Sequence, residues 1–245
     1  MATKLLMAKS PEEAAVSKTA SAAFVAGGTE VNRLGSDIAE KSATLISLKR
    51  CSGLDGIEED AGYVTIGAMC TFQDLVESGK VPGWLKEAAL FMASRTKRNM
   101  ATIGGNIAAK RSDSYLIPAL SAAGAVLELL GSDAKTERIG IAEYLDGAYD
   151  GKLITSVTAA KDLKLVSKRY ANTAQSHAVL TMSAALAEEG VYMNGAVKNV
   201  GLLHFCDLEK AFNEDPEISE DKIIDMVKTC TGLETSDDMF GSDAY

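Results

Sequence analysis

Two short glycine-centred stretches, far apart in the chain, most constrain what it can fold into. They are Phe24–Val31 and Ala101–Ala108, and each runs from small apolar residues through a Gly-Gly pair to residues that can hydrogen-bond. Glycine tolerates positive φ and lets the backbone approach a ligand without a Cβ in the way. Successive N–H groups in such a turn form a concave anion site. One such turn is weak evidence, but two together predict a long diphosphate ligand such as a dinucleotide.

The composition is that of a globular protein. The 245 residues are 47% hydrophobic and 24% charged, enough for a real core and two or three subdomains. A net charge of −9 without a basic cluster argues against a nucleic-acid-binding protein. Polar residues, glycine and proline break the apolar run over residues 117–130, and residues 1–10 lack a long apolar segment. We therefore expect neither a membrane span nor a signal peptide, and predict a cytoplasmic protein.

The cysteines and histidines form no recognisable metal motif. The four cysteines are scattered, at Cys51, Cys70, Cys206 and Cys230. Because no pair has C-x-x-C spacing, we expect free thiols, no iron–sulfur cluster and no metal on this chain. With only two histidines and no H-E-x-x-H motif, a zinc site is not expected either. We expect both His177 and His204 to be structural.

Apolar runs and helix caps divide the chain into three units. The first fifty residues predict a β-α-β-α-β unit, in which a capping box at Ser10–Glu13 opens one helix and Thr29–Leu34 forms the other. The second unit contains a short helix at Thr71–Ser78, with Asp74 placed to cap it, and an amphipathic helix at Gly83–Ser94. In the third unit, residues 177–188 fit a strand or a helix.

The second glycine stretch also carries a specific resemblance. Arg98–Ala108, with Ser112-Asp113 and Pro118–Leu120 after it, resembles the pattern R-N-x-A-T-I-G-G-N-I-A…S-D…P-A-L. That pattern belongs to the FAD-binding subunit of molybdenum hydroxylases, the group of xanthine dehydrogenase and carbon monoxide dehydrogenase medium subunits. Ala26–Glu30 resembles the same family's A-G-G-T-[DE] turn. Further segments are similar in the same order: Gly62–Ala68, Asp150–Thr158, Ser176–Val179 and Gly241–Tyr245.

The resemblance implies an α+β fold, namely a two-subdomain FAD-binding domain of the vanillyl-alcohol oxidase (PCMH-type) group plus a small C-terminal α+β domain. We expect FAD-binding subdomains at residues 1–55 and 56–161. Residues 162–245 would resemble the C-terminal domain of the CO dehydrogenase flavoprotein. In such complexes a molybdopterin-binding large subunit oxidises the substrate, and a small subunit with [2Fe–2S] clusters passes the electrons to FAD. The flavin then reduces NAD⁺, oxygen or another acceptor.

The resemblance also implies which residues hold the FAD, and none of them is catalytic because the flavin carries the chemistry. The predicted cofactor-binding residues are Val25, Ala26, Gly27, Gly28, Thr29, Glu30, Val31, Thr102, Ile103, Gly104, Gly105, Asn106, Asp113, Ile154 and Lys168. Backbone N–H groups of Ala26–Glu30 would surround the diphosphate, helped by a helix that starts at Thr29. Asp113 would accept a hydrogen bond from a ribose hydroxyl, and Lys168 would lie near the flavin. The FAD is expected to be non-covalent, since neither histidine lies in a glycine stretch.

Simpler explanations stand beside these. Each glycine stretch is compatible with an ordinary turn. Asp113 is compatible with a solvated carboxylate in a turn, and Ile154 with a buried residue of a strand. Lys164 and Arg169 lie close to Lys168 in sequence, so which of these cations matches the family's lysine is left open. The chain lacks two of the family's residues before Asp113, and Lys110-Arg111 replace the usual proline; we expect them to be surface charges.

Three functions are compatible with these patterns. The first is the electron-transferring FAD subunit of a molybdenum hydroxylase. The second is a free-standing FAD-dependent reductase or oxidase on the same fold, against which the lack of a local acid–base cluster argues. The third is an interaction subunit without cofactor, against which the two intact glycine stretches argue.

Overall fold

The computed structural model describes residues 4–147, 149 and 151–229, and three sheets organise them. The N-terminal sheet is parallel, with strand order β1-β3-β2. Its elements are β1 (Lys4–Met7), α1 (Pro11–Val16), β2 (Ala22–Val25), α2 (Ile38–Lys41) and β3 (Thr44–Ser47). Parallel neighbours need crossover connections, which α1 and the segment carrying α2 supply. Ser10 caps α1 as expected, although Glu13 reaches back to the N–H of Lys9 rather than to that of Ser10.

The helix expected at Thr29–Leu34 is wrong. These residues form turns, and the next helix is α2 at Ile38–Lys41. Gly28 and Gly35, which flank this segment, take positive φ values of 76° and 79° and so limit any helix to the residues between them. The Gly28 carbonyl accepts the backbone N–H of Asn32 at 3.0 Å and the side-chain amide of Asn32 at 2.9 Å, but the next backbone bonds, Arg33 to Glu30 and Ser36 to Arg33, span three residues, so no α-helix continues.

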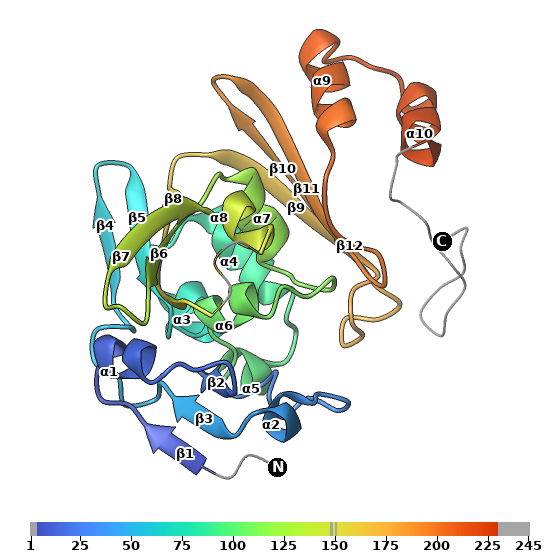
Figure 1. Cartoon of the computed structure of the whole chain (residues 1–245). Helices are drawn as coiled ribbons and strands as arrows, with labels where there is room; N and C mark the ends of the chain where they lie inside the picture. The colour runs from blue at the N-terminus through green and yellow to red at the C-terminus, as the bar shows by residue number, and fades with distance from the viewer. Residues whose placement is uncertain (1–3, 148, 150, 230–245) are drawn as a thin grey trace.

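A five-stranded antiparallel sheet in the order β4-β5-β8-β6-β7 forms the middle of the molecule. Its strands are β4 (Ile57–Asp60), β5 (Tyr63–Gly67), β6 (Val126–Leu130), β7 (Thr136–Gly140) and β8 (Leu153–Ala160). The accompanying helices are α3 (Phe72–Glu77), α4 (Gly83–Leu90), α5 (Arg95–Arg98), α6 (Ile103–Ala108), α7 (Ile117–Ala122) and α8 (Ile141–Leu145). In Figure 1 the sheet curves around these helices. The cap predicted at α3 is confirmed, because Thr71 and Asp74 form a reciprocal capping box.

The C-terminal sheet is antiparallel, with strand order β12-β11-β10-β9. Its elements are β9 (Lys164–Tyr170), β10 (Leu180–Ala187), β11 (Gly190–Val197), β12 (Gly201–His204), α9 (Cys206–Glu214) and α10 (Glu220–Lys228). Residues 180–187, for which strand and helix were both open, are therefore a strand. One face of the sheet packs against α7, while α9 and α10 lie at its far end from the N-terminal sheet (Figure 1).

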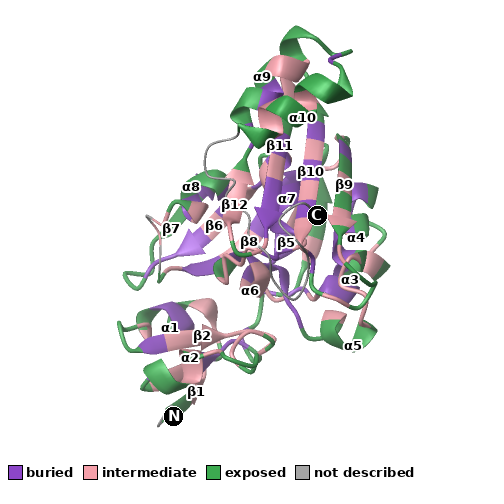
Figure 2. Cartoon of the chain, turned by 90° about the vertical axis from the view of Figure 1, so that its right-hand side faces the viewer, coloured by how far each residue is buried: buried purple, intermediate pink, exposed green. Residues whose placement is uncertain are grey.

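Three apolar clusters hold these parts together. The largest joins the five-stranded sheet to its helices through fully buried side chains such as Phe72, Leu85 and Ile107. A second joins the N-terminal sheet to β6 and β8, where Ile46 belongs to the same cluster as Leu130 and Leu153. The third lies under α9 and α10. Figure 2 shows buried residues concentrated in the strands and α7, and exposed ones on α9 and α10.

The mixed helix-and-strand fold predicted from the sequence is confirmed. Each sheet lies inside one of the three predicted units, whose boundaries at residues 55 and 161 stay a prediction. Cys230 and the Gly241–Tyr245 segment lie outside the described residues. Among the helices that the structure does describe, none is long and apolar enough to cross a membrane.

Candidate functional site

The two glycine stretches meet in space. Gly27 follows β2 and lies so close to the segment before α6 that an ideal Cβ on it would fall 1.6 Å from the carbonyl oxygen of Met100. An ideal Cβ on Gly105 would lie 3.7 Å from the Cβ of Ala26. The absence of a side chain at Gly27 therefore allows the loop after β2 to approach the segment before α6, and Gly105 lies within ordinary contact distance of that loop. We refer to residues 26–31 as the Gly27 loop.

The Gly27 loop presents unpaired backbone donors. In the described part of the chain, the N–H groups of residues 27–31 donate no hydrogen bond to a backbone or side-chain acceptor. Gly28 has the positive φ that allows successive N–H groups to turn toward a common point. Five consecutive free donors beside a cavity form the kind of concave site that binds anions.

The second glycine stretch is a helix start rather than a turn, which corrects the sequence-based expectation. Thr102 caps α6 and accepts the N–H of Gly105 at 3.1 Å. The N–H groups of Ile103 and Gly104 donate to the carbonyls of Cys70 and Ala68. The first amides of α6 are thus already used within the protein. This stretch contributes close approach, because an ideal Cβ on Gly104 would lie 2.6 Å from that of Ala68.

A groove runs between the two stretches. A cavity of about 180 Å³ is lined by the Gly27 loop, by Thr102, Gly104 and Gly105, and by apolar side chains that include Ile154. A second cavity, of about 510 Å³, shares Thr29, Glu30, Gly105 and Ala109 with the first. Since they share walls, we treat the two cavities as one groove. Its combined extent is in the range of pockets for cofactor-sized ligands, roughly 300–1,000 Å³.

Asp113 lies at the wider end of the groove in a network of charges. Although its residue surface is only 8% exposed, it accepts two hydrogen bonds from Arg111, at 2.6 and 2.7 Å. His177, from the loop between β9 and β10, places Nδ1 3.1 Å from Oδ2 of Asp113, the oxygen that also accepts from Nη2 of Arg111. Burial alone raises the pKa of Asp113, but the hydrogen bonds and charge of Arg111 outweigh it and lower that pKa below the ordinary value. The Asp113 carboxylate is therefore ionised at neutral pH.

Arg111 also connects Asp113 to the Gly27 loop. Its Nη1 lies 3.5 Å from Oε1 of Glu30, which in turn accepts a hydrogen bond from Arg33 at 2.9 Å. The Asp113 partner raises the pKa of Arg111 further above its ordinary value. The expectation that Arg111 is a surface charge is wrong, because only 29% of its side chain is exposed and it lines the groove. The network thus connects residues from the parts of the chain that carry each of the three sheets.

Ile154 reaches the groove at an irregular point of β8. The register between β6 and β8 shifts at Glu128/Leu129, so that Leu129 pairs with Ile154 and Thr155 is the extra residue. Thr155 donates a hydrogen bond to the carbonyl of Glu128 at 3.1 Å. Such a bulge re-aims neighbouring side chains and backbone. Ile154 is at once a buried strand residue and part of the groove wall.

Most of the predicted residues line this groove, but three do not: Val25, Ile103 and Lys168. Val25 ends β2 and Ile103 is buried in the core. Lys168 is exposed on β9, on the face opposite its neighbour Arg169, whose guanidinium lies 5.6 Å from the ring centre of Tyr115. The structure thus brings Arg169, rather than Lys168, toward the wall of the groove, since Tyr115 lines it.

Sequence reasoning missed several polar residues of the groove, of which three carry charge or titrate close to its predicted ligands. Arg111 and His177 lie in its wider part, and Lys152 lines the narrower part, where its ammonium pairs with Glu137 at 2.6 Å. Lys152 lies in the Asp150–Thr158 segment, whose resemblance assigned it no role. The Ser176–Val179 segment, noted for its resemblance, marks the neighbourhood of His177 but does not reveal its contact with Asp113.

The sequence is similar to those of known proteins. Residues 2–159 match the family model described as the FAD binding domain in molybdopterin dehydrogenase. The uncharacterized protein YgfM of Escherichia coli K12 is 32% identical over 193 residues, which cover 77% of this chain and 71% of that protein. The carbon monoxide dehydrogenase medium chain of Afipia carboxidovorans is also 32% identical, over 158 residues that cover 57% of this chain and 54% of that one.

Solved structures show the same fold at lower sequence identity. Carbon monoxide dehydrogenase from Hydrogenophaga pseudoflava, in a form that lacks the Mo-pyranopterin moiety, has a TM-score of 0.85 at 19% identity, covering 100% of this chain and 92% of that one. Quinoline 2-oxidoreductase from Pseudomonas putida 86 has a TM-score of 0.82, also at 19% identity, covering 100% and 91%. The family match spans more than half of the chain, and it includes both glycine stretches. The chain therefore belongs to the family of FAD-binding domains of molybdopterin dehydrogenases.

Proposed function

We propose that this chain is the FAD-binding electron-transfer subunit of a molybdopterin-dependent hydroxylase or dehydrogenase. In this function it takes electrons from the [2Fe–2S] clusters of a small partner subunit and passes them to NAD or another acceptor. A molybdopterin-binding large subunit oxidises the substrate. The cytoplasmic location expected from the sequence belongs to the same proposal.

The observation that carries this proposal is the loop of residues 27–31, which lines the same groove as Gly105 and whose five N–H groups donate no hydrogen bond within the described part of the chain. A diphosphate carries negative charge and many acceptor oxygens, so it suits unpaired amide donors. The chemistry of the remaining groove residues also suits FAD. Phe24, Leu48 and Ile154 offer apolar contacts at its narrow part, and the Asp113 carboxylate at its wide part offers an acceptor for a sugar hydroxyl.

The chain's own residues bind and position the cofactor. The Gly27 loop holds the diphosphate, α6 forms a rigid opposite wall, and Arg111 holds Asp113 ionised and in place. When bound, FAD supplies the capacity to take up and release electrons singly or in pairs. We assign no residue of this chain to proton transfer, and the FAD is held without a covalent bond.

Two glycine variants test the assignment of the groove. Gly28→Val puts a branched side chain on a residue with φ of 76°, and Gly105→Val adds one between the Thr102 cap and Ala26. We expect both variants to be purified with little visible flavin absorbance and to bind added FAD at least about tenfold more weakly. Gly79→Ala is the matched control, since an ideal Cβ there meets no atom within 4 Å. Full flavin content in both valine variants would contradict the placement.

Purification with the partners tests the role in a complex. We expect the chain to co-purify with a molybdopterin subunit and a ferredoxin-like subunit, and its flavin to be reduced by substrate only in their presence. Turnover of a small-molecule substrate by the isolated chain would instead favour the free-standing reductase or oxidase. A colourless chain that binds no FAD would favour the interaction subunit.

A further inference from the structure

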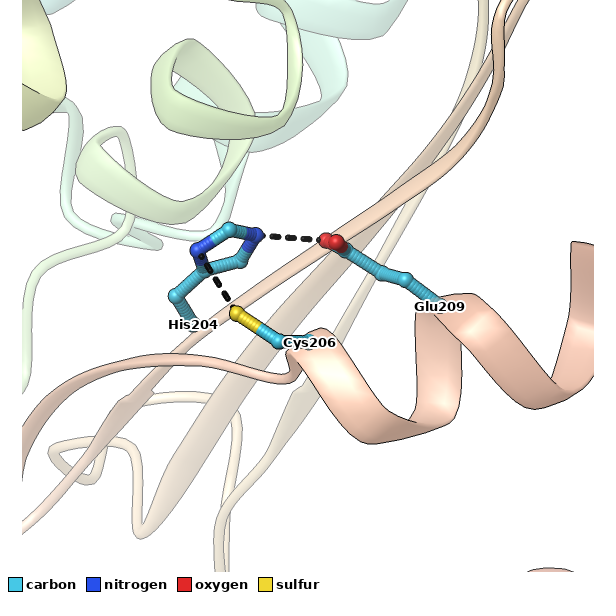
Figure 3. A group of neighbouring side chains, drawn as sticks. All are labelled: His204, Cys206 and Glu209. Atoms are coloured by element: carbon cyan, nitrogen blue, oxygen red, sulfur yellow. Dashed lines mark hydrogen bonds and ion pairs between the residues drawn. The ribbon is translucent and has the colours of Figure 1, made fainter.

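A cysteine, a histidine and a glutamate form a separate cluster where the C-terminal sheet meets α9. His204 is the last residue of β12, Cys206 is the first residue of α9, and Glu209 follows one turn later. Figure 3 shows the imidazole of His204 between the sulfur of Cys206 and the carboxylate of Glu209. None of the three lines the groove assigned to FAD.

The three side chains are hydrogen-bonded in series. The Sγ atom of Cys206 lies 3.3 Å from Nδ1 of His204, and Nε2 of His204 lies 2.8 Å from Oε1 of Glu209. The Glu209 side chain is only 12% exposed, and it also accepts the backbone N–H of Met193 at 2.6 Å. The carboxylate is thus fixed, and it holds the ring with Nδ1 toward the sulfur. A nucleophile, a base and a residue that orients the base occur in the order that activates a thiol.

The geometry favours a reactive thiol over a metal centre, although the three possible ligand atoms lie within 4.8 Å of one another. A single ion would have to bind one nitrogen of His204 together with both other side chains. Here the ring presents a different nitrogen to each neighbour, so that Cys206 and Glu209 lie on opposite edges of the imidazole (Figure 3). This arrangement suits proton transfer along the series.

The two other described cysteines are in contrasting surroundings. Cys51 and Cys70 are buried, and their thiols donate to backbone carbonyls. Burial raises the pKa of both thiols, that of Cys70 to about 11. Cys206 is exposed, is the first residue of a nine-residue helix, and places its sulfur 3.3 Å from a ring nitrogen of His204.

We propose that Cys206 is a nucleophilic thiol that exchanges with low-molecular-weight disulfides, with His204 as the base that accepts its proton. The Cys206 sulfur attacks one sulfur of the small disulfide, a new S–S bond forms, and the original S–S bond breaks. The released thiolate takes up the proton from His204. Cys206 is oxidised to a mixed disulfide, one half of the small disulfide is reduced to a thiol, and a second small thiol reverses the reaction. This chain therefore carries a reversible redox modification site outside the flavin groove.

The test uses the full chain and 5,5′-dithiobis(2-nitrobenzoate) as the small disulfide, with the coloured thiol released as the readout. Trypsin digestion before re-reduction locates the adduct, because Cys206 falls in residues 199–210, apart from Cys51 and Cys70 and from Cys230. We expect Cys206 to react first in the native protein. His204→Gln should slow its reaction about tenfold or more, and Glu209→Gln several-fold, because they remove the base or its partner charge.

Asp207→Asn is the matched control, since this exposed carboxylate lies in the same first turn of α9 and outside the series. We expect its rate to stay within about twofold of the wild type, because a solvated charge has a weak effect. Thermal unfolding of each variant checks that the fold is kept, and His204→Gln changes a half-exposed side chain. An unchanged Cys206 rate in folded His204→Gln would overturn the proposal. So would tight, stoichiometric zinc binding by the wild type that blocks the thiol.

Discussion

Gly27 and Met100 touch so closely that an ideal Cβ on Gly27 would lie 1.6 Å from the Met100 carbonyl oxygen. The contact joins the Gly27 loop to the segment that leads into α6. This close contact explains why the first residue of the pair is a glycine, whereas the positive φ of Gly28 explains the second.

Gly27→Ala should therefore destabilise the protein more than an ordinary surface change. Forcing a Cβ into this contact moves the Gly27 loop away from Met100, and we expect a loss of about 1–3 kcal/mol in the free energy of unfolding. Weaker FAD binding should accompany it. Gly56→Ala is the control, because nothing lies within 4 Å of an ideal Cβ there. Chemical denaturation and FAD titration measure both effects, and equal stability of the two variants would contradict the prediction.

Thr102→Ala should weaken both α6 and the cofactor site. It removes the cap that accepts the Gly105 N–H, which costs about 1 kcal/mol of stability. The freed end of α6 forms one wall of the groove, so FAD affinity should fall as well. Ser10→Ala removes the corresponding cap of α1, which is remote from the groove. Similar destabilisation of both variants, with FAD affinity reduced only in Thr102→Ala, is the expected result.

Arg111→Met should cost more stability than Arg33→Met. The first change leaves the buried Asp113 carboxylate without its bidentate partner, and we expect a loss of roughly 2 kcal/mol because the arginine side chain is itself partly exposed. The second breaks an exposed pair with Glu30, which is worth about 0–1 kcal/mol. Urea denaturation at neutral pH compares them. A larger loss of unfolding free energy in Arg33→Met than in Arg111→Met would contradict the prediction.

Asp113 predicts a specific acid sensitivity. Its pKa is lowered in the folded protein, so its contribution to stability is complete above its ordinary pKa of 3.8 and is lost as the pH falls through the lower folded-state pKa. The free energy of unfolding of the wild type should therefore fall more steeply than that of Asp113→Asn between about pH 5 and pH 2. Denaturation curves at several pH values measure the slopes. Parallel slopes would show that Asp113 has the same pKa in both states.

The sequence predicted the fold well where local signals and family patterns agree. The N-cap at Ser10, the capping role of Asp74 and the mixed helix-and-strand fold are confirmed. It failed at Thr29–Leu34, a short polar segment between two glycines with positive φ, where the backbone bonds after Asn32 span three residues and form turns. It also missed that Gly104-Gly105 begin a helix, since two adjacent glycines favour a turn unless tertiary contacts, here with Ala68, select the helix.

The candidate site was predictable in part for the same reasons. Motifs identified the Gly27 loop and α6, but the charge network depends on contacts between distant segments. Glu30 and Arg111 are 81 residues apart, and nothing in the sequence pairs them. For Lys168 and Arg169, strand alternation requires opposite faces, but only the packing of the C-terminal sheet on α7 decides which face turns inward.

The unequal hydrogen bonding of the two glycine stretches has a thermodynamic consequence. The wall built by α6 is complete as soon as the chain has folded, whereas the opposite wall has amides that only solvent or a bound anion can satisfy. Ligand binding should therefore reduce the mobility of the Gly27 loop and have little effect on α6. Slower amide exchange at residues 27–31 after FAD addition, with little change at residues 103–106, would be its signature.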